Sequence, residues 1–549
     1  MRAFPLISGD FQPEPWFSRA PMEKRPPSGP KGRRDDRGPR SGAGGKDRTG
    51  DRPFKGPRPA GAKFGGDRER GDRPNRDRPG GDRERGPRDG QSRDRKSRDD
   101  DSAPSRPLST KPGVAARRAV LEILDRIDEG ATLDDAIART RPFEQLEGSD
   151  RSFARLLAAE TLRRRGAIDH ILGGYLDRPL PKKSARVMDI LRIAAAQLLI
   201  LDTPAHAAVS TSVELANERG ETGGYASLIN AVTRKIADAG KEALEKIPPR
   251  TDTPAWIWRS WERSYGPNGA KDIAEAHRAT PPLDITLKPG EDMDAWLARF
   301  RAAGHEPLLL ANGSVRFSRI SDVTLLDGYE EGAWWVQDVA ASLPVRLLGN
   351  VRGKLVYDLC AAPGGKTLQL ASAGASVTAI DKSGARLERV QENLERTNLR
   401  ARLVEEDALR FRPAELADAI LLDAPCTATG TIRRHPDIPW SKGETALSAL
   451  TELQGKMIDH ALRLLKPGGL LVYCVCSLQR EEGEAQAKAA LARNANIARI
   501  AIDREEIGGF DKAINRDGDL RTLPSMLAEQ GGMDGFFAVR FRAGEPPAA

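Results

Sequence analysis

The chain has 549 residues, a formal net charge of +8, a sequence pI of about 9.3 and only 4 cysteines. This length allows three or four domains, and the excess of positive charge favours a polyanionic partner such as a nucleic acid. With no cysteine before Cys360, a secreted disulfide scaffold is excluded and reduced thiols are expected. The sequence has no signal peptide, no run of the roughly 18–20 apolar residues that a membrane span needs, and no metal-ligand spacing of its histidines. We therefore expect a cytoplasmic protein that binds neither membrane nor metal, and the oligomeric state is not predicted.

Residues 1–110 consist mainly of Arg, Asp, Gly, Pro, Lys and Ser, with imperfect repeats such as GDRP at 71–74 and GGDRER at 80–85. Large apolar side chains are too rare there to offset the chain entropy lost on folding, so we predict a disordered tail. Asp and Glu neutralise much of its basic charge. Composition therefore leaves two roles open, a solubilising segment or an arginine-rich tether for RNA.

The segment 111–250 repeats its apolar residues at the period of a helix. Gly130 is the expected stop of the first helix, and Asp150 is the expected N-cap of a later one. Strand-like alternation is scarce, so we predict an all-helical domain. Its apolar stripes are Val120, Ile123, Leu124 and Ile127; Phe153, Leu156 and Leu157; Val187, Ile190, Leu191, Ala194 and Leu198; and Leu228, Ile229, Val232 and Ile236.

Residues 251–350 mix helix and strand signals and are predicted to form a small α+β subdomain that binds RNA. Trp256, Trp258 and Trp261 cluster near its start, and an extended run follows at 281–287. Aromatic side chains in a basic module can stack on bases, but tryptophan at this spacing is more often part of a core, and we favour the core.

From 351 to 545 strands and helices alternate. Continuous apolar runs at 355–357, 377–380, 419–422 and 470–473 predict strands of a parallel sheet covered on both faces, as in a Rossmann-like α/β domain. Ligands of such sheets bind beyond the carboxyl ends of the strands. The residues that suggest chemistry all lie there.

The turn after the first strand reads DLCAAPGGKT at 358–367. A P-loop for ATP would explain Gly365, Lys366 and Thr367, but it requires glycine where Cys360 stands, and Pro363 would stiffen the loop. The alternative ligand is S-adenosylmethionine, which has a cationic sulfonium and no phosphate.

Three carboxylates follow successive strands and favour the second ligand. Asp381 is placed to accept the ribose hydroxyls, Asp407 suits the adenine edge, and Asp423 ends the next strand. A single Asp at such a place is most often a helix N-cap, but three at equivalent positions fit a cationic, hydroxyl-rich ligand better than a triphosphate.

Two thiols, Cys426 and Cys476, also stand at the ends of apolar strands. A thiolate that adds to carbon-6 of cytosine makes carbon-5 nucleophilic, so this pair suggests methyl transfer to carbon-5. Spacing alone does not say which thiol attacks. Cys360 and Cys474 are explained as small apolar residues.

The motif DAPCTATGTIRRHPDI at 423–438, with Gln337, Asp338 and DGFF at 534–537, resembles the RsmB/Nop2/Sun family of RNA cytosine-5 methyltransferases, most closely the bacterial RsmB (Sun) type. The resemblance spans about residues 113–542. It implies an RNA substrate, 16S ribosomal RNA, a Rossmann-like catalytic domain and, from DRSF at 150–153 and SLINAV at 227–232, a NusB-like RNA-binding domain before it.

The resemblance also implies roles for individual residues. Cys476 is the nucleophile, Cys426 assists product release, and Asp423 also contacts the base. Two positions depart from the family pattern, because Val475 replaces the usual Thr and the run at 284–288 reads DITLK. The alternatives are a non-catalytic RNA-binding assembly factor and a P-loop ATPase. The expected cofactor residues are Cys360, Ala361, Ala362, Pro363, Gly364, Gly365, Lys366, Asp381, Asp407 and Asp423, and the expected substrate-loop residues are Arg433, Arg434 and His435.

Overall fold

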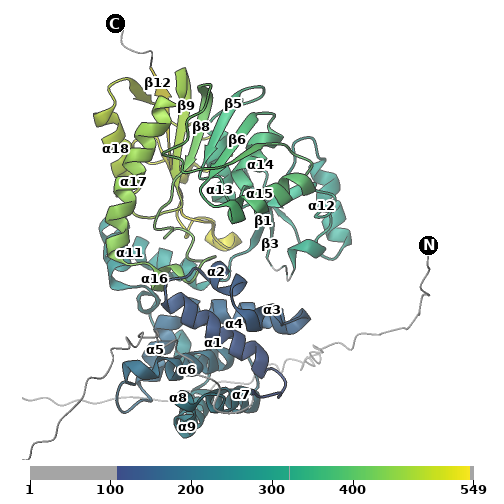
Figure 1. Ribbon diagram of the computed structural model, residues 1–549, viewed down its shortest axis with the longest axis vertical. Coiled ribbons are helices and arrows are strands. Elements are labelled where there is room, and N and C mark those ends of the chain that lie inside the picture. Colours follow the sequence, from purple (N-terminus) through teal and green to yellow (C-terminus); the bar gives the residue numbers. More distant parts are fainter. Residues whose placement is uncertain (1–107, 319, 321, 545–549) are drawn as a thin grey trace, which may run out of the picture. The chain divides into compact units, whose positions relative to one another are not determined.

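The computed structural model describes residues 108–318, 320 and 322–544, and Figure 1 shows their arrangement. The tail predicted for residues 1–110 lies almost entirely outside this part. The described residues form a helical domain, a small α+β subdomain and a mixed β-sheet covered by helices. None of their helices is both long and apolar enough to cross a membrane.

The helical domain is built around α6, which packs against α1, α4, α5, α7 and α9. The predicted apolar stripes account for most of its core, because every member of the first stripe is buried and α1 ends two residues before Gly130. Its helices are α1 (Val114–Asp128), α2 (Leu133–Ala138), α3 (Arg141–Glu144), α4 (Gly148–Arg163), α5 (Arg165–Gly173), α6 (Ala185–Leu199), α7 (Ala205–Asn217), α8 (Gly220–Gly223), α9 (Ala226–Ala239) and α10 (Glu242–Glu245).

Helix α4 departs from two of our expectations. It begins at Gly148 after the N-cap residue Glu147, so Asp150 is not the cap and instead lies in the first turn, where a carboxylate is favourable to the helix dipole. Leu156 is 44% exposed, whereas Leu157 is buried, so the core face of α4 is narrower than predicted.

Helix α11 (Ala255–Arg278) follows, with a kink at Gly266, whose φ is 74°, next to Pro267. Trp258 and Trp261 are buried in a cluster with Ile432 of the catalytic region, which confirms that these tryptophans belong to a core. The α+β subdomain after it has an antiparallel sheet in the order β2-β3-β1-β4. Its elements are β1 (Leu283–Leu287), α12 (Met293–Ala302), β2 (Leu308–Leu309), β3 (Val315–Phe317) and β4 (Trp334–Val336).

The catalytic sheet has the order β10-β12-β9-β8-β5-β6-β7, in which the strands from β5 to β9 are parallel (Figure 1). All four predicted strands are confirmed and extend beyond their predicted ends. Strands β10 and β12 pair antiparallel at one edge and were not predicted. The strands are β5 (Leu355–Leu359), β6 (Ser376–Asp381), β7 (Arg402–Glu405), β8 (Ala417–Asp423), β9 (Leu465–Val475), β10 (Ile497–Arg499), β11 (Leu520–Arg521) and β12 (Phe537–Ala543).

Helices cover the sheet and start close to the carboxyl ends of its strands. The strand order reverses between β5 and β8, which makes the carboxyl edge there the expected ligand crevice. The helices are α13 (Val339–Arg346), α14 (Gly365–Ser372), α15 (Gly384–Arg396), α16 (Ile438–Ser441), α17 (Glu444–Arg463) and α18 (Glu484–Arg493).

A buried ion pair joins the small subdomain to the end of the chain. Arg316 on β3 binds both carboxylate oxygens of Asp284 at 2.7 and 2.8 Å and donates to the carbonyls of Gln530 and Gly532. Both side chains are almost fully buried. The buried negative charge of Asp284 is therefore neutralised in this ion pair by the Arg316 guanidinium.

We expect Arg316→Met to destabilise the subdomain by about 3–5 kcal/mol, because the substitution leaves the Asp284 carboxylate buried without its partner. Arg299→Met is the matched control, since Arg299 pairs with Glu331 at the surface of the same subdomain and should change the unfolding curve little. Urea unfolding followed by tryptophan fluorescence measures both. Equal curves for the two variants would contradict the expectation.

Candidate active site

The carboxyl ends of the parallel strands bring the predicted residues to one edge of the sheet. Leu359 of β5 lies beside Leu422 of β8 and Ile380 of β6, and Asp423 lies beside Cys474 of β9. Turns leaving these strands therefore start side by side. Residues that are far apart in the sequence meet here because parallel strands all end at the same edge.

The turn after β5 has the sharp backbone expected of a ligand loop. Cys360 has a φ of 63°, and Gly364 has a φ of 103° at the N-cap of α14. A Cβ on Gly364 would approach the Val390 side chain to 2.9 Å, so this position requires glycine for both reasons. The Ala362 N–H donates to Asp381 Oδ2 at 3.2 Å, which ties the turn to the end of β6.

Three carboxylates lie around the turn, and two of them have a cationic partner, because Asp381 pairs with Arg386 at 3.4 Å and Asp423 pairs with Lys366 at 2.7 Å. Burial, Asp381 and Asp423 raise the pKa of the Cys360 thiol above its usual range. Burial also raises the pKa of Asp358 to about 7, although the Thr367 hydroxyl donates to this carboxyl at 2.6 Å. The second oxygen of Asp358 is buried without a hydrogen-bond partner. A concentration of carboxylates fits a cation such as a sulfonium and disfavours a triphosphate.

Asp358 was not singled out in the sequence, because it lies inside the strand rather than after it. The available signal was an ionisable residue in the apolar run LVYDL of β5. Such a residue is almost never fully buried without a partner, and it therefore marks a site.

Lys366 does not point its charge into the turn. Its ammonium binds Asp423 Oδ2 at 2.7 Å and lies 5.0 Å from the centre of the Phe536 ring. Burial alone would lower the pKa of Lys366, but Asp423 outweighs it and raises the pKa, so the Lys366 ammonium stays charged. The other Asp423 oxygen accepts a hydrogen bond from the Cys474 thiol at 3.6 Å.

Asp407 lies two residues beyond β7 and is exposed. Its carboxylate accepts a hydrogen bond from the Leu409 N–H at 2.9 Å. Nearer the turn, Glu405 accepts from the Gly384 N–H at 3.0 Å and was not predicted. Asp407 is therefore the most peripheral of the three predicted acids.

The two predicted thiols face each other. The sulfurs of Cys426 and Cys476 are 3.5 Å apart, with Cys426 buried and Cys476 half-buried. The hydrogen bond with Cys476, followed by burial, raises the pKa of Cys426 well above its usual range. The Cys426 thiol accordingly stays protonated at pH 7. Cys476 is the more accessible of the two.

The loop residue Arg433, one of the expected substrate-loop residues, is buried. Its guanidinium binds Asp534 Oδ1 at 2.9 Å, Asp338 Oδ2 at 2.8 Å and the Gly531 carbonyl at 2.8 Å. Burial alone would raise the pKa of Asp338, but Arg433 and then Arg434 outweigh it and lower the pKa. These contacts give Arg433 a structural role.

The next two residues of the loop are more open. The Arg434 side chain is 28% exposed and binds Asp534 Oδ2 at 3.3 Å. His435 is half-buried, and burial lowers its pKa, so its ring is neutral at pH 7. Of the three predicted substrate-loop residues, Arg434 has the charged group that a ligand can reach.

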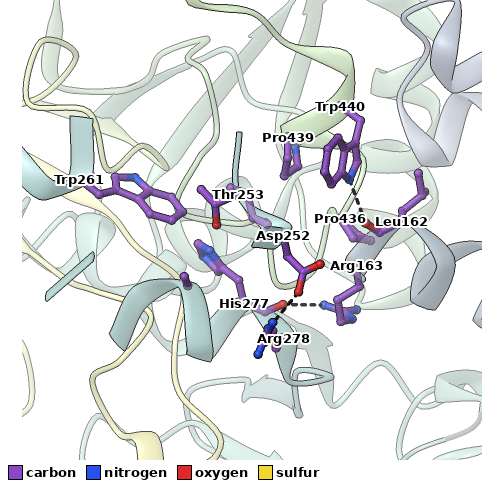
Figure 2. A pocket seen from close by; sticks show the side chains of 12 residues that line it. Leu162, Arg163, Asp252, Thr253, Trp261, His277, Arg278, Pro436, Pro439 and Trp440 are labelled. Atoms are coloured by element: carbon purple, nitrogen blue, oxygen red, sulfur yellow. Dashed lines mark hydrogen bonds and ion pairs between the residues drawn. The ribbon is translucent and has the colours of Figure 1, made fainter. Parts of the chain in front are cut away.

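A small cavity lies between the helical domain and the catalytic region, and Figure 2 shows its lining. Its volume of about 10 Å³ is enough for roughly one water molecule. Both ring nitrogens of His277 are buried there without a partner, and burial lowers the pKa of His277 to about 3. Arg163 donates to the carbonyls of His277 and Arg433, so this is a packed joint rather than a ligand site.

Comparisons with known proteins agree with this arrangement. The chain matches the NusB family over residues 114–238 and the family of 16S rRNA methyltransferases RsmB/F over residues 345–542. Ribosomal RNA small subunit methyltransferase B of Vibrio vulnificus is 33% identical over 408 residues, which are 72% of this chain and 94% of that protein. The protein of the same name from Pseudomonas putida is 33% identical over 442 residues, 78% of this chain and 98% of the relative.

The crystal structure of PH0851 has a TM-score of 0.61 and 19% identity, and it covers 79% of this chain and 100% of its own. It shows that the fold is shared. The family matches are to methyltransferases, so the P-loop ATPase interpretation of the turn is wrong. The chain is an S-adenosylmethionine-dependent methyltransferase, and it belongs to the RsmB/F family of 16S rRNA methyltransferases, with a NusB-family domain ahead of its catalytic sheet.

Proposed function

We propose that the protein methylates carbon-5 of a cytosine in 16S ribosomal RNA through a covalent bond between Cys476 and carbon-6 of the ring. The observation that carries this proposal is the 3.5 Å separation of the Cys426 and Cys476 sulfurs at the sheet edge that also holds the cofactor turn. Addition to the ring needs one thiolate, and release of the product needs a second group beside it.

S-adenosylmethionine supplies an electrophilic methyl group at this edge. We assign its binding to the turn from Cys360 to Lys366 and to the carboxylates Asp381, Asp407 and Asp423. The acidic surroundings of the turn support this assignment, because they favour a cationic ligand. Asp381 is the central residue of the set, since it also orients the turn through the Ala362 N–H.

The reaction on the ring balances as follows. The Cys476 thiolate bonds to carbon-6 while N3 takes up a proton, and carbon-5 becomes nucleophilic and gains the methyl group. A base then removes the carbon-5 proton, the double bond to carbon-6 re-forms, and the carbon–sulfur bond breaks with its electron pair returning to Cys476. N3 releases its proton, so one proton leaves for each methyl group transferred.

Cys426 is our candidate for the base. In the free enzyme its hydrogen bond with Cys476 is the largest cause that raises its pKa. Once the Cys476 sulfur is bonded to carbon-6, it carries neither a proton nor a charge, and that cause is gone. Cys426 therefore ionises more readily at the stage where a base is needed.

Asp423 is our candidate for the contact to the ring. A carboxylate stabilises a protonated N3 by accepting its hydrogen bond, and the hydrogen bond from the Lys366 ammonium orients the Asp423 carboxylate. We also propose Arg434 and His435 as substrate-loop residues. Val475, where the family usually has Thr, packs its buried side chain in the apolar core, so its substitution leaves the thiols in place.

The RNA assignment rests on the names of the relatives and on the NusB-family domain. We propose the boundaries 111–250 for that domain, 251–350 for an RNA-binding subdomain and 351–545 for the catalytic domain. Because its proposed substrate is 16S ribosomal RNA, we also propose that the protein acts in the cytoplasm. The competing function, a non-catalytic RNA-binding assembly factor, leaves the paired thiols and the buried Lys366–Asp423 contact without a purpose.

Cys476→Ala should abolish methyl transfer, by on the order of 10³-fold or more, because no other group adds to carbon-6. The measurement is transfer of labelled methyl groups to unmodified 16S rRNA, with the product identified as 5-methylcytosine. Equilibrium binding of S-adenosylmethionine should be unchanged. RNA binding with no transfer by the wild-type protein would favour the assembly factor.

Cys426→Ala should accumulate a covalent protein–RNA complex, because addition proceeds while removal of the carbon-5 proton is slowed. Denaturing gels detect the complex as a shifted band that requires both RNA and S-adenosylmethionine. The double variant that also carries Cys476→Ala should show no such band. A band in the single variant Cys476→Ala, and none in Cys426→Ala, would reverse the roles of the two thiols.

Asp381→Asn should weaken S-adenosylmethionine binding by about 10–100-fold, since hydrogen bonds to a charged group contribute about 1.5–3 kcal/mol. Asp407→Asn is the matched control, and we expect a smaller loss because Asp407 is exposed. Isothermal titration without RNA ranks the two. A larger effect at Asp407 would overturn our assignment of the central ligand.

A further inference from the structure

Glu482 is a buried carboxylate near the thiols that the reaction above does not use. It lies in the loop between β9 and α18 and has no exposed surface. It accepts hydrogen bonds from the Thr427 N–H at 2.9 and 3.2 Å, the Thr427 hydroxyl at 2.5 Å, the Ser477 hydroxyl at 2.5 Å and the Gln454 amide at 3.0 Å. Three segments of chain therefore converge on one carboxylate.

Two of these partners directly follow the thiols in the sequence. Thr427 comes after Cys426, and Ser477 comes after Cys476, although 50 residues separate the two cysteines. Each cysteine thus has its next neighbour fixed to the same pair of oxygens. The residues that follow the two cysteines therefore share one anchor.

The surrounding contacts tighten the same unit. The Thr427 and Ser477 hydroxyls are 3.0 Å apart, and the Gly430 N–H donates to the Cys476 carbonyl at 3.0 Å. Gln454 also donates to the Pro425 carbonyl at 2.9 Å, just before Cys426. The loop after β8 and the loop after β9 are therefore held as one piece.

The position suits a carboxylate better than an amide. Every group facing Glu482 in these contacts is a donor, and an ionised carboxylate is an acceptor at both oxygens. A glutamine of the same shape could keep the Thr427 N–H and the Gln454 amide on its one carbonyl oxygen, but its NH₂ group would then face the Thr427 and Ser477 hydroxyls and force both to accept where they now donate to Glu482. Thr427 and Ser477 are fully buried as well and separate Glu482 from the ligand crevice.

We propose that Glu482 is a positioning residue that sets the separation of the Cys426 and Cys476 sulfurs, and so couples formation of the covalent bond to its release. It acts through Thr427 and Ser477 and does not touch the substrate. The kinetic part of this inference rests on the proposed function. The geometric part concerns only the two sulfurs and does not depend on any substrate.

The test compares Glu482→Gln with Glu481→Gln, the same substitution at the adjacent residue. The Glu481 side chain is 46% exposed and lies 4.0 Å from Arg263, so its loss leaves the anchor intact. Dibromobimane, which becomes fluorescent when it bridges two nearby thiols, reports the sulfur separation in the full-length protein without RNA. Peptide mapping identifies a bridge between Cys426 and Cys476.

We expect Glu482→Gln to slow bridging by about 10-fold and to lower kcat by about 100-fold, which is the cost of a misplacement of roughly 1 Å. KM for RNA and the affinity for S-adenosylmethionine should stay within about twofold. Thr427→Val should reproduce the defect and Thr427→Ser should not, because serine keeps the hydroxyl that donates to Glu482. Glu481→Gln should match the wild type in every measurement.

Wild-type bridging and kcat in Glu482→Gln would overturn the inference. Should Glu482→Gln fail to fold, the comparison of Thr427→Val with Thr427→Ser decides in its place, and equal bridging in these two would also overturn it. Slow bridging in the Glu482 variant, with no methyl transfer by the wild-type protein, would support the positioning role and reject the proposed function instead.

Discussion

The course of the active-site loop depends on the buried guanidinium of Arg433. Only 1% of this residue is exposed, and its donors bind Asp338 before α13, Asp534 before β12 and the Gly531 carbonyl. Its own carbonyl accepts from Arg163 of the helical domain at 2.5 Å. Because a buried charge requires full pairing, these four segments are held together, and the loop that begins at Cys426 has one path.

The charges of the two arginines and two carboxylates in this cluster balance. Asp338 and Asp534 face Arg433 and Arg434, so the group of four is neutral. Burial, and then the neighbouring Asp338, raises the pKa of Asp534 to about 6, which marks how closely the two carboxylates are packed. Arg434 keeps its charge because the carboxylates outweigh burial, and its field also reaches Cys476.

The departure from the family pattern at 284–288 also has a structural counterpart. Asp284 is buried, binds Arg316 and accepts from the Val339 N–H at the start of α13. The carboxylate therefore faces the interior and connects the small subdomain to the catalytic sheet. A change of residue at this position alters the support of the site and not a surface that RNA could reach.

The order of the domains, the parallel strands and the residue types at their carboxyl ends could all be predicted from the amino-acid sequence. Continuous apolar runs separated by helical patterns are typical of a parallel sheet covered by helices. Asp381, Asp423, Cys426 and Cys476 could therefore be assigned to the carboxyl edge of that sheet from the sequence. The resemblance to a family added the order in which the thiols act, which spacing had left open. Apolar runs and the residues that follow them are local features of the sequence, so they can be recognised without knowing which residues are in contact.

Which polar residues form buried structural contacts, and which remain accessible to a ligand, became clear only from the packing of the folded chain. Arg433 and Arg434 are neighbours with the same side chain, yet one is buried in ion pairs and the other is partly open. Glu482 carried no signal in the sequence, because its partners Thr427 and Ser477 come from other segments. Burial and pairing between distant segments are properties of the packed chain, and a linear pattern does not contain them.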